Sequence, residues 1–391
     1  MAKFLFTSES VTEGHPDKAC DAISDAILDE YLLQDSESRV ACETLATKGL
    51  VVVSGEIRST GVVDVDDLVI KTLSKIGYTI ENSGIGENDL QIISKLDKQS
   101  DEIAQGVDSN NISDQGAGDQ GMMFGFACKE TPELMPLPIQ IAQKLTERLS
   151  ILRKSEELEW LRPDGKSQVT IQYLDKKPVC IKKVVLATQH EDLLRRFGSF
   201  KKELDFIRKE IIEKVIRPVL NVYSVPYEED FIVNGTGRFV FGGPAADTGL
   251  TGRKIIVDTY GGYAPHGGGA FSGKDPSKVD RSAAYMARYI AKNIVAADLA
   301  ERCEVQLSYS IGVADPTSFY VRTFGTGKHA DEKLTKITRA VFPLKPGEIV
   351  DHLDLKKPRY KNTAAYGHFG RVLDNFTWEK IDMKEELLSK I

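Results

Sequence analysis

The stretch RVACETLATKGLVVVSGEIR, residues 39–58, decides the fold class. Residues 39–47 and 50–58 read as two strands, and Lys48-Gly49 between them predicts a hairpin turn. Residues 66–77 follow with the apolar spacing of an amphipathic helix. A strand pair followed by a helix is therefore the unit from which we expect the protein to be built.

This unit recurs about three times along the chain. A helix opens at Pro16, which suits a first helical turn. The later expected elements are a helix over 136–153, strands at 169–173 and 179–187, a helix over 201–217 stopped by Pro218, a helix over 281–300, and strands at 305–313 and 318–324. The pattern predicts an α+β fold with mixed or antiparallel sheets and helices on one face, not a doubly wound parallel sheet. No repeat is visible at the residue level.

Length and composition limit the classes of protein. The chain has 391 residues, 41% hydrophobic and 28% charged, and a net charge of −7. These values predict an ordinary globular protein of two or three domains and exclude a mostly disordered one. The acidity argues against a nucleic-acid protein that relies on overall basicity. No apolar run is long enough for a membrane span or a secretory signal, so we expect a cytoplasmic protein.

Domain boundaries and cysteines complete this outline. We expect an N-terminal α+β domain over 1–102, a mobile gating loop over 103–114, and two further α+β domains over 115–230 and 231–391. The gating loop lies in a polar stretch that is long for a passive connection. The five scattered cysteines form no CxxC pair, which excludes a zinc site and predicts reduced, mostly buried thiols.

The most informative segment for function is GGGAFSGKDPSK, residues 267–278. Its glycines let backbone N–H groups approach phosphate oxygens, and Lys274 and Lys278 add positive charge. Residues 268–274 satisfy the spacing of a P-loop, but Asp275 stands where magnesium needs Ser or Thr, and no strand leads into the segment. We therefore reject the P-loop and keep a phosphate cradle of another design. Taken alone, the segment is equally well explained as a surface turn.

Three other segments have the same character. Residues 14–18, GHPDK, place an imidazole, a carboxylate and an ammonium at a helix start, where backbone N–H groups attract phosphate. In residues 235–254, Arg253-Lys254 suits an anion, Phe239 a base, and Asp247 an amine or hydroxyl. Residues 116–121, GAGDQG, hold a glycine-flanked acid. Each is individually more often a cap or a turn, but four together predict a site for a polyphosphate and magnesium, since no GxSxG, HExxH or dinucleotide fingerprint occurs.

These segments, with residues 8–18, 160–168, 242–262, 266–282 and 366–371, resemble the S-adenosylmethionine synthetase family. The resemblance spans nearly the full chain. It implies three similar α+β domains related by pseudo-threefold symmetry, in a homodimer with active sites at the subunit interface or in a homotetramer. It also implies that ATP and L-methionine are joined to S-adenosylmethionine, and that the tripolyphosphate is hydrolysed to phosphate and diphosphate.

The resemblance also implies roles for individual residues. The ATP site would comprise His15, Asp164, Lys166, Arg238, Phe239, Asp247, Arg253, Lys254, Ala270 and Lys274. Among these, His15, Lys166, Lys274 and Arg253 would be catalytic. Methionine would contact Glu56, Gln99, Asp119, Asp247 and Lys278. The metal ligands would be Asp17 and Asp280 for two Mg2+ ions per site, and Glu43 for K+.

The candidate site residues suit this reaction. A thioether sulfur has no proton to lose, so its attack on C5′ needs no general base. Positioning and charge stabilisation of the departing triphosphate must supply most of the acceleration. The chain departs from the family pattern at Asn234-Gly235, where many members have Asn-Pro, and over residues 190–202, which are longer than in bacterial relatives.

Two other classes of protein fit these residues less well than an S-adenosylmethionine synthetase does. A catalytically silent subunit that only binds nucleotide would lose some charged residues, but His15, Asp17 and Lys166 are intact, as are Lys274 and Asp280. A nucleic-acid-binding module would use the same basic residues on phosphodiesters, but it predicts a basic face with interleaved aromatic residues. No nucleic-acid or membrane partner is expected.

Overall fold

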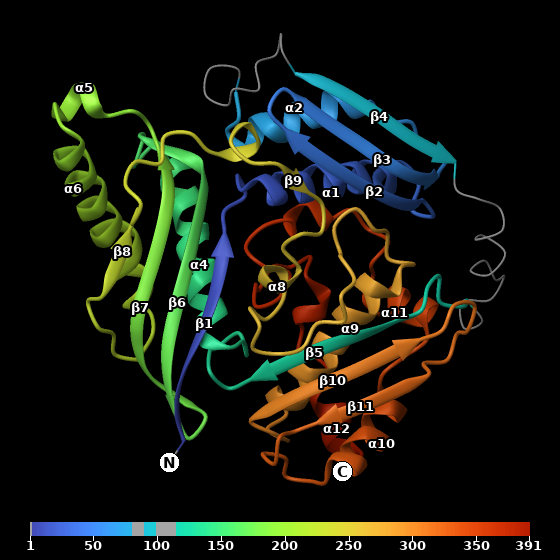
Figure 1. Cartoon of the computed structure of the whole chain (residues 1–391). Helices are drawn as coiled ribbons and strands as arrows, with labels where there is room; N and C mark the ends of the chain where they lie inside the picture. The colour runs from blue at the N-terminus through green and yellow to red at the C-terminus, as the bar shows by residue number, and fades with distance from the viewer. Residues whose placement is uncertain (1, 80–89, 99–114) are drawn as a thin grey trace.

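The computed structural model describes residues 2–79, 90–98 and 115–391. Three sheets surround a centre that holds the glycine-rich segments between residues 241 and 278 (Figure 1). One long helix packs on each sheet: α1 (Pro16–Gln34), α4 (Leu137–Lys154) and α9 (Val279–Ala296). The α+β class, the mixed sheets and the helices on one face of each sheet are thereby confirmed.

The first sheet has the strand order β4-β3-β2-β9. Its strands are β2 (Arg39–Thr47), β3 (Leu50–Arg58), β4 (Gln91–Lys98) and β9 (Gly249–Leu250). The hairpin β2-β3 is antiparallel with Thr47 opposite Leu50, so the turn at Lys48-Gly49 lies where it was predicted. Strand β4 joins β3 in parallel, and β9 joins β2 from a distant part of the chain. Helix α1 packs on β2, and α2 (Val65–Ile76) packs on α1.

The second sheet has the order β1-β6-β7-β8 and the third β11-β10-β5. The second comprises β1 (Lys3–Val11), β6 (Leu161–Leu174), β7 (Lys177–His190) and β8 (Phe231–Val233), and the third β5 (Gly121–Cys128), β10 (Arg302–Tyr309) and β11 (Ser318–Arg322). Helix α4 covers β1 and β6, and α9 covers β5 and β10. Each sheet therefore combines strands that are far apart in the sequence.

The remaining helices are short. They are α5 (Leu194–Phe197), α6 (Phe200–Ile211), α7 (Arg217–Leu220), α8 (Ile255–Asp258), α10 (Asp331–Val341), α11 (Pro346–His352) and α12 (Lys384–Ser389). Single 3-10 turns lie at Gly243–Ala245, Tyr360–Asn362 and Thr377–Glu379. In the described part of the chain, no helix is both long enough and apolar enough to cross a membrane. All five cysteines are free thiols, and four of them are buried, as the sequence predicted.

One predicted helix end is wrong. We expected the helix over 201–217 to stop at Pro218, but Pro218 lies inside α7. A π-helical turn, Ile212–Ile216, separates α6 from α7, and Pro218 follows it in the first turn of α7. A proline is tolerated in a first helical turn because the N–H groups there have no partner within the helix. The π turn thus lets the chain continue past the proline.

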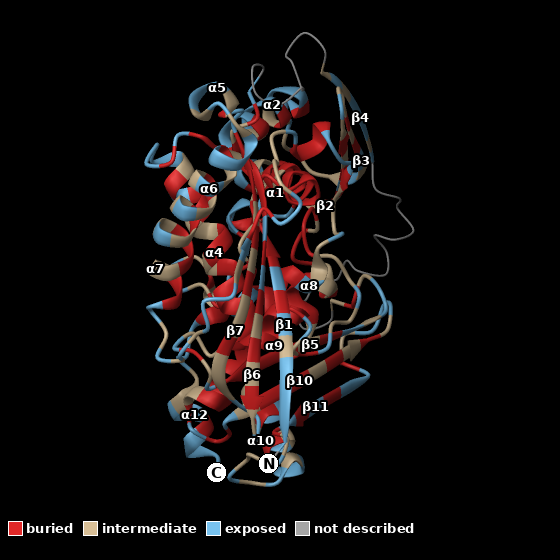
Figure 2. Ribbon diagram, turned by 60° about the vertical axis from the view of Figure 1, so that its left-hand side comes forward, coloured by how far each residue is buried: buried red, intermediate tan, exposed pale blue. Residues whose placement is uncertain are grey.

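Helix α1 is buried along most of its length, as Figure 2 shows, and it carries aspartates at every fourth position. Asp17, Asp21 and Asp25 accept hydrogen bonds from the N–H groups of Leu250, Gly252 and Gly273, at 2.9, 2.9 and 2.8 Å. The fourth, Asp29, accepts from the N–H groups of residues 359–361 at 2.8–2.9 Å. One face of the helix therefore holds three segments of the C-terminal half of the chain, around residues 250–252, 273 and 359–361.

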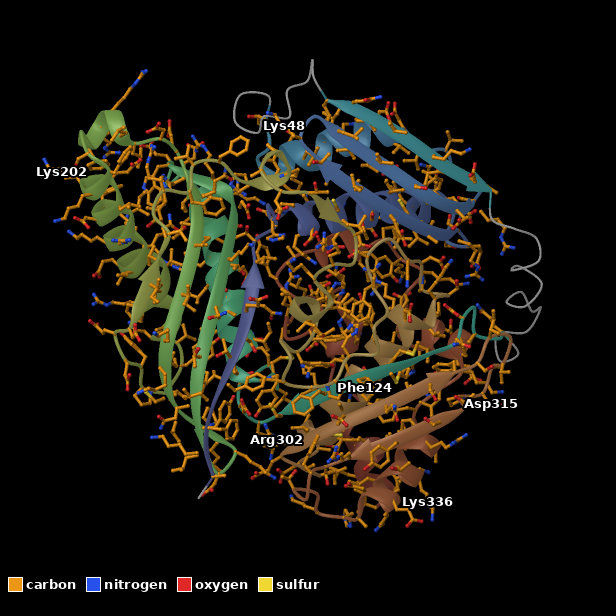
Figure 3. All side chains as sticks on the ribbon, in the orientation of Figure 1. Lys48, Phe124, Lys202, Arg302, Asp315 and Lys336 are labelled. Atoms are coloured by element: carbon orange, nitrogen blue, oxygen red, sulfur yellow. The ribbon has the colours of Figure 1, made fainter. Side chains whose placement is uncertain are left out.

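The opposite faces of the sheets, away from the long helices, carry exposed apolar side chains. Leu45, Val52 and Ile93 are cross-strand neighbours in the first sheet, and Ile93 is 42% exposed. In the third sheet, Phe124, labelled in Figure 3, and Tyr320 are both paired with Gln306, and they lie on this face because the neighbouring Gly125 faces α9. Glu43 and Glu56 lie on the same face of the first sheet as Ile93, since residues two apart in a strand share a face.

The buried ion pair of Asp25 and Arg281 gives a test of this packing. Arg281 donates two parallel hydrogen bonds, at 2.8 and 2.9 Å, and both side chains are fully buried. We expect Asp25→Ala to lower the free energy of unfolding by about 3–5 kcal/mol, because it leaves a buried guanidinium without its counter-charge. Urea unfolding monitored by circular dichroism measures the change. Asp66→Ala, at an exposed position of α2, is the matched control, and an equal effect of both substitutions would contradict the role of Asp25.

Candidate active site

The start of α1 brings an imidazole, a carboxylate and an ammonium together. His15 caps the helix, and its Nδ1 accepts from the N–H of Asp17 at 3.2 Å. Lys254 forms an ion pair with Asp17 at 2.5 Å. Burial opposes ionisation of Asp17, but hydrogen bonds from Lys254 and the Leu250 N–H outweigh it and lower the pKa of Asp17. Burial, Lys254 and Lys166 lower the pKa of His15 to about 3, so the imidazole is neutral at physiological pH.

Strand β6 supplies the next two residues, Asp164 and Lys166. Asp164 is buried, and its Oδ2 accepts from the Gly243 N–H at 2.9 Å. Its Oδ1 is buried without a hydrogen-bond partner among the described residues. Burial raises the pKa of Asp164 to about 6, partly offset by the positive charge of Lys166. A buried carboxylate oxygen without a donor is costly, and it indicates a place for a hydroxyl or amine of a ligand.

The glycine-rich segment 267–278 forms a second group of charges. Lys274 pairs with Asp280 at 2.5 Å. The backbone of residues 273–275 runs along the edge of β2, where Ala41 and Lys274 form a β-bridge. Lys274 therefore points to the same side as Ala41, which is the uncovered face that also carries Glu43 and Glu56.

Small residues, glycine and alanine, lie where the two groups of charges adjoin. A Cβ atom at Gly252 would lie 2.5 Å from the Cβ of Ala270, so the two backbones meet closely, and Gly252 has a φ of +78°. A Cβ atom at Gly269 would overlap the carboxylate of Asp280. Larger residues at either glycine would separate the segment that carries Arg253 and Lys254 from the segment that carries Lys274. The glycines thus serve close approach of these segments.

Phe239 and Arg238 were both expected around the nucleoside, but they have different surroundings. The Phe239 N–H donates to Nε2 of His190, and a Cβ atom at Gly242 would lie 2.9 Å from the Phe239 ring. Phe239 is therefore near the Gly242–Gly243 turn that Asp164 holds. Arg238 is engaged elsewhere: it pairs with the buried Glu203 and with Asp192. Its guanidinium is thus directed toward α6 and the residues before α5.

Several predicted residues are exposed. Arg253, Asp247, Asp119, Glu43 and Glu56 are all exposed to solvent. Lys278 pairs with Asp275, which is fully buried and also accepts from the Val40 N–H. Gln99 and the predicted gating loop over 103–114 lie outside the described residues. The described contacts therefore bring His15, Asp17, Asp164, Lys166 and Lys254 together in one group, and Lys274, Asp280 and Ala270 in the adjoining one.

The sequence reasoning placed the ammonium of Lys18 at the helix start, but it missed the residues that hold Lys18 and also missed Tyr78. Lys18 is buried between Asp21 and Asp258, at 2.8 and 2.5 Å. These two carboxylates raise the pKa of Lys18 against the effect of burial. Tyr78 donates a hydrogen bond to the carbonyl of Gly14 and so holds the turn before His15. The four-residue spacing of aspartates in an otherwise apolar helix was a signal for Asp21, but nothing local to Tyr78 or Asp258 indicated a role.

The donor set fits magnesium brought by a phosphate ligand. Among the residues that the structure describes, no three His, Cys, Asp or Glu side chains gather closely enough to hold a metal ion by themselves. Asp17 and Asp280 are single carboxylates, each beside a lysine. Mg2+ is usually bound by one or two carboxylates together with substrate phosphates and water. The site can therefore bind an anionic phosphate chain with metal.

Comparisons with known proteins agree with this chemistry. Three domain families match the chain: the N-terminal domain of S-adenosylmethionine synthetase over residues 3–101, its central domain over 114–239, and its C-terminal domain over 241–380. The S-adenosylmethionine synthases of Maridesulfovibrio salexigens and Nitratidesulfovibrio vulgaris are each 55% identical to the chain over 385 residues. The similarity covers 98% of this chain and 97% of each relative.

The depressed pKa of His15 is directly testable. We expect the Cε1–H resonance of His15 to stay unchanged between about pH 8 and pH 5, because the imidazole is neutral throughout this range. Removal of a positive charge in Lys254→Ala should raise the pKa of His15, while Lys48→Ala, at an exposed turn, should not. Nuclear magnetic resonance of histidine-labelled protein measures both. A midpoint near 6.5 in the wild type would show that the imidazole is solvated.

Proposed function

The chain belongs to the S-adenosylmethionine synthetase family, and on this premise we propose that methionine sulfur attacks C5′ of ATP in the site around His15 and Lys274. The enzyme is an adenosyl transferase that makes S-adenosylmethionine. The S–C5′ bond forms while the C5′–O bond breaks, and the electron pair leaves with the triphosphate. The product sulfonium is positively charged, and the triphosphate is then hydrolysed to phosphate and diphosphate by addition of water.

One observation carries this proposal: each carboxylate of the magnesium-ligand type is already paired with a lysine. Lys254 lies 2.5 Å from Asp17, and Lys274 lies 2.5 Å from Asp280. A magnesium triphosphate has the complementary charges, because its metal suits the carboxylates and its phosphate oxygens suit the ammonium groups. When the substrate binds, each lysine can pair with a phosphate oxygen and each aspartate with the metal. Each lysine–aspartate pair is then replaced by two new pairs, and no charge is left unpaired.

The residues of the chain have separate tasks in this reaction. Lys166, Lys254, Lys274 and Arg253 stabilise the charge that develops on the departing triphosphate. His15, neutral before the substrate arrives, donates a hydrogen bond to the triphosphate, and Asp164 accepts one from the nucleoside through its unpartnered Oδ1. We assign Phe239 to the base, and Asp119, Asp247 and Glu56 to the methionine side of the site, where carboxylates tolerate a sulfonium. Gln99 and Lys278 complete the methionine contacts.

We assign two kinds of metal ion to this site. Mg2+, two ions per site, would be held by Asp17 and Asp280 and would neutralise part of the triphosphate charge. Glu43 would supply one oxygen to K+. The fit rests on the single carboxylates and their lysine partners, since magnesium that arrives with phosphate needs no complete protein cage.

We propose further that two copies of the chain complete the site. The uncovered sheet faces carry exposed apolar residues, among them Ile93, Met122 and Tyr320. Exposed apolar side chains that cluster on a sheet face often mark an interface. Glu43, Glu56 and Lys274 lie on the uncovered face of the first sheet, so a second copy packed there would approach them. Homodimers of this kind can pair further into a homotetramer.

The reaction and the role of Lys274 are tested together by product analysis. Purified protein incubated with ATP, methionine, Mg2+ and K+ should yield a sulfonium product, phosphate and diphosphate, identified by mass spectrometry. Lys274→Met should lower kcat by about 100-fold or more, by analogy with loss of one oxyanion-hole donor. The matched control is Lys202→Met, at an exposed position on α6, remote from the site (Figure 3).

Two results would oppose the proposal. Release of diphosphate and AMP, or of the γ-phosphate alone, with methionine unmodified would exclude the transfer reaction. Normal turnover of Lys274→Met would remove Lys274 from the leaving-group role but leave the reaction itself intact.

The dimer is tested by light scattering. The chain has a mass of 43.3 kDa, and we expect the wild type at twice that value or a multiple of it. Ile93→Glu, which places a charge on the uncovered sheet face, should shift the mass toward 43.3 kDa and abolish activity. Val222→Glu, at a residue that is 78% exposed outside the sheets, should change neither. A monomeric, fully active wild type would contradict the interfacial site.

A further inference from the structure

A cavity of about 370 Å³ lies away from the proposed catalytic site, between α1, α2 and the segment 361–371. This volume falls in the range of about 300–1,000 Å³ that is usual for small-molecule sites. None of the lysines assigned to the triphosphate lines it. It is therefore a separate pocket, and the reaction described above does not account for it.

The walls of this pocket are strongly cationic. Its charged lining residues are Lys71, Lys75, Lys154, Lys361 and Arg371, with Glu13 as the one acid among the lining residues that the structure describes. Glu13 is already paired, with Arg153 at 2.8 Å and with Lys154 at 2.7 Å. The chain as a whole has a net charge of −7, so this excess of positive charge is local.

Three of these cations have N–H groups that form no hydrogen bond to the described residues. The ammonium groups of Lys75 and Lys361 have no hydrogen-bond or ion-pair partner within the described parts of the chain. Arg371 is fixed through Nη1, which donates to the carbonyl oxygens of residues 362, 365 and 367 at 2.7, 2.9 and 3.3 Å. Its Nε and Nη2 make no hydrogen bond to described residues. A guanidinium that is held in place with free N–H groups is well suited to bind an anion.

The rest of the lining includes a group of apolar residues, which we call the floor of the pocket. It consists of Ala22, Ala26, Leu68, Ile76, Ala364 and Tyr366. Tyr366 has a φ of +65°, an unfavourable conformation for a residue with a side chain, and its hydroxyl donates to Ser150 Oγ at 2.6 Å. The ring is thus held against the pocket at some conformational cost, which is frequent at ligand sites.

We propose that this pocket binds a small organic phosphate whose apolar body lies on the floor and whose phosphate is bound by Lys75, Lys361 and Arg371. The apolar floor excludes a fully polar anion as the best occupant, because burial of a methyl- or ring-sized body adds affinity there. A neutral apolar molecule fits less well, because it would form no ion pair with Lys75, Lys361 or Arg371.

The test uses 1-naphthyl phosphate as the probe, titrated into the full-length protein in a calorimeter. An excess of magnesium tripolyphosphate, which has no apolar body, fills the triphosphate site first. We expect saturable binding, and an increase in Kd of about tenfold or more in the double variant Lys75→Glu/Lys361→Glu. The matched control is Lys336→Glu/Lys202→Glu, since both lysines project from helices remote from the pocket (Figure 3).

The result that would overturn the proposal is an equal Kd in both double variants, or no saturable binding to the wild type. Tighter binding of the uncharged probe 1-naphthol than of 1-naphthyl phosphate would overturn it as well, because it would show that the cations do not contribute. All the substituted lysines are exposed, so the variants should keep the wild-type thermal unfolding temperature. Where the reversed charges unfold the protein, Lys75→Gln/Lys361→Gln gives the same comparison with a smaller increase in Kd.

Discussion

The architecture depends on hydrogen bonds from backbone N–H groups to the aspartates of α1. A carboxylate removed from water costs several kcal/mol unless charged or polar groups replace its hydration. Here Asp17, Asp21 and Asp25 are each satisfied by an N–H of the central glycine-rich segments. The segments in turn gain a fixed position against a rigid helix. The same contacts therefore replace the hydration that the buried aspartates lose and fix the segments that carry Lys254 and Lys274 relative to each other.

Local sequence patterns predicted the regular elements well, and long-range pairing poorly. The hairpin β2-β3 needs only alternation and a turn, and α1 needs only a proline start and periodic apolar residues, so both could be read from neighbouring residues. Strand β9 consists of Gly249–Leu250 and exists because it pairs with β2 two hundred residues earlier. The chain continues past Pro218 after a π turn over Ile212–Ile216. Neither feature has a local signal.

The same division applies to the site. The spacing of Gly, His, Asp and Lys marked the segments that carry charge, because phosphate chemistry needs these residue types close together in sequence. It did not show which lysine faces which carboxylate. The pairs Lys254–Asp17 and Lys274–Asp280 differ in this respect, since the first joins residues 237 positions apart and the second only six. Arg238 was assigned by resemblance to the nucleoside, yet its guanidinium pairs with Glu203 of α6 and with Asp192, which lies in the longer region 190–202.

The lysine–aspartate pairs also explain how a site can be rich in cations before its substrate arrives. Unpaired ammonium groups close together would repel one another and lower each other's pKa, so they would lose charge or spread apart. Asp17 beside Lys254 and Asp280 beside Lys274 balance the charge of these ammonium groups and hold them in place. The cost is that the carboxylates must find another cation when phosphate takes the lysines. A divalent metal that is carried by the phosphate itself would meet that need.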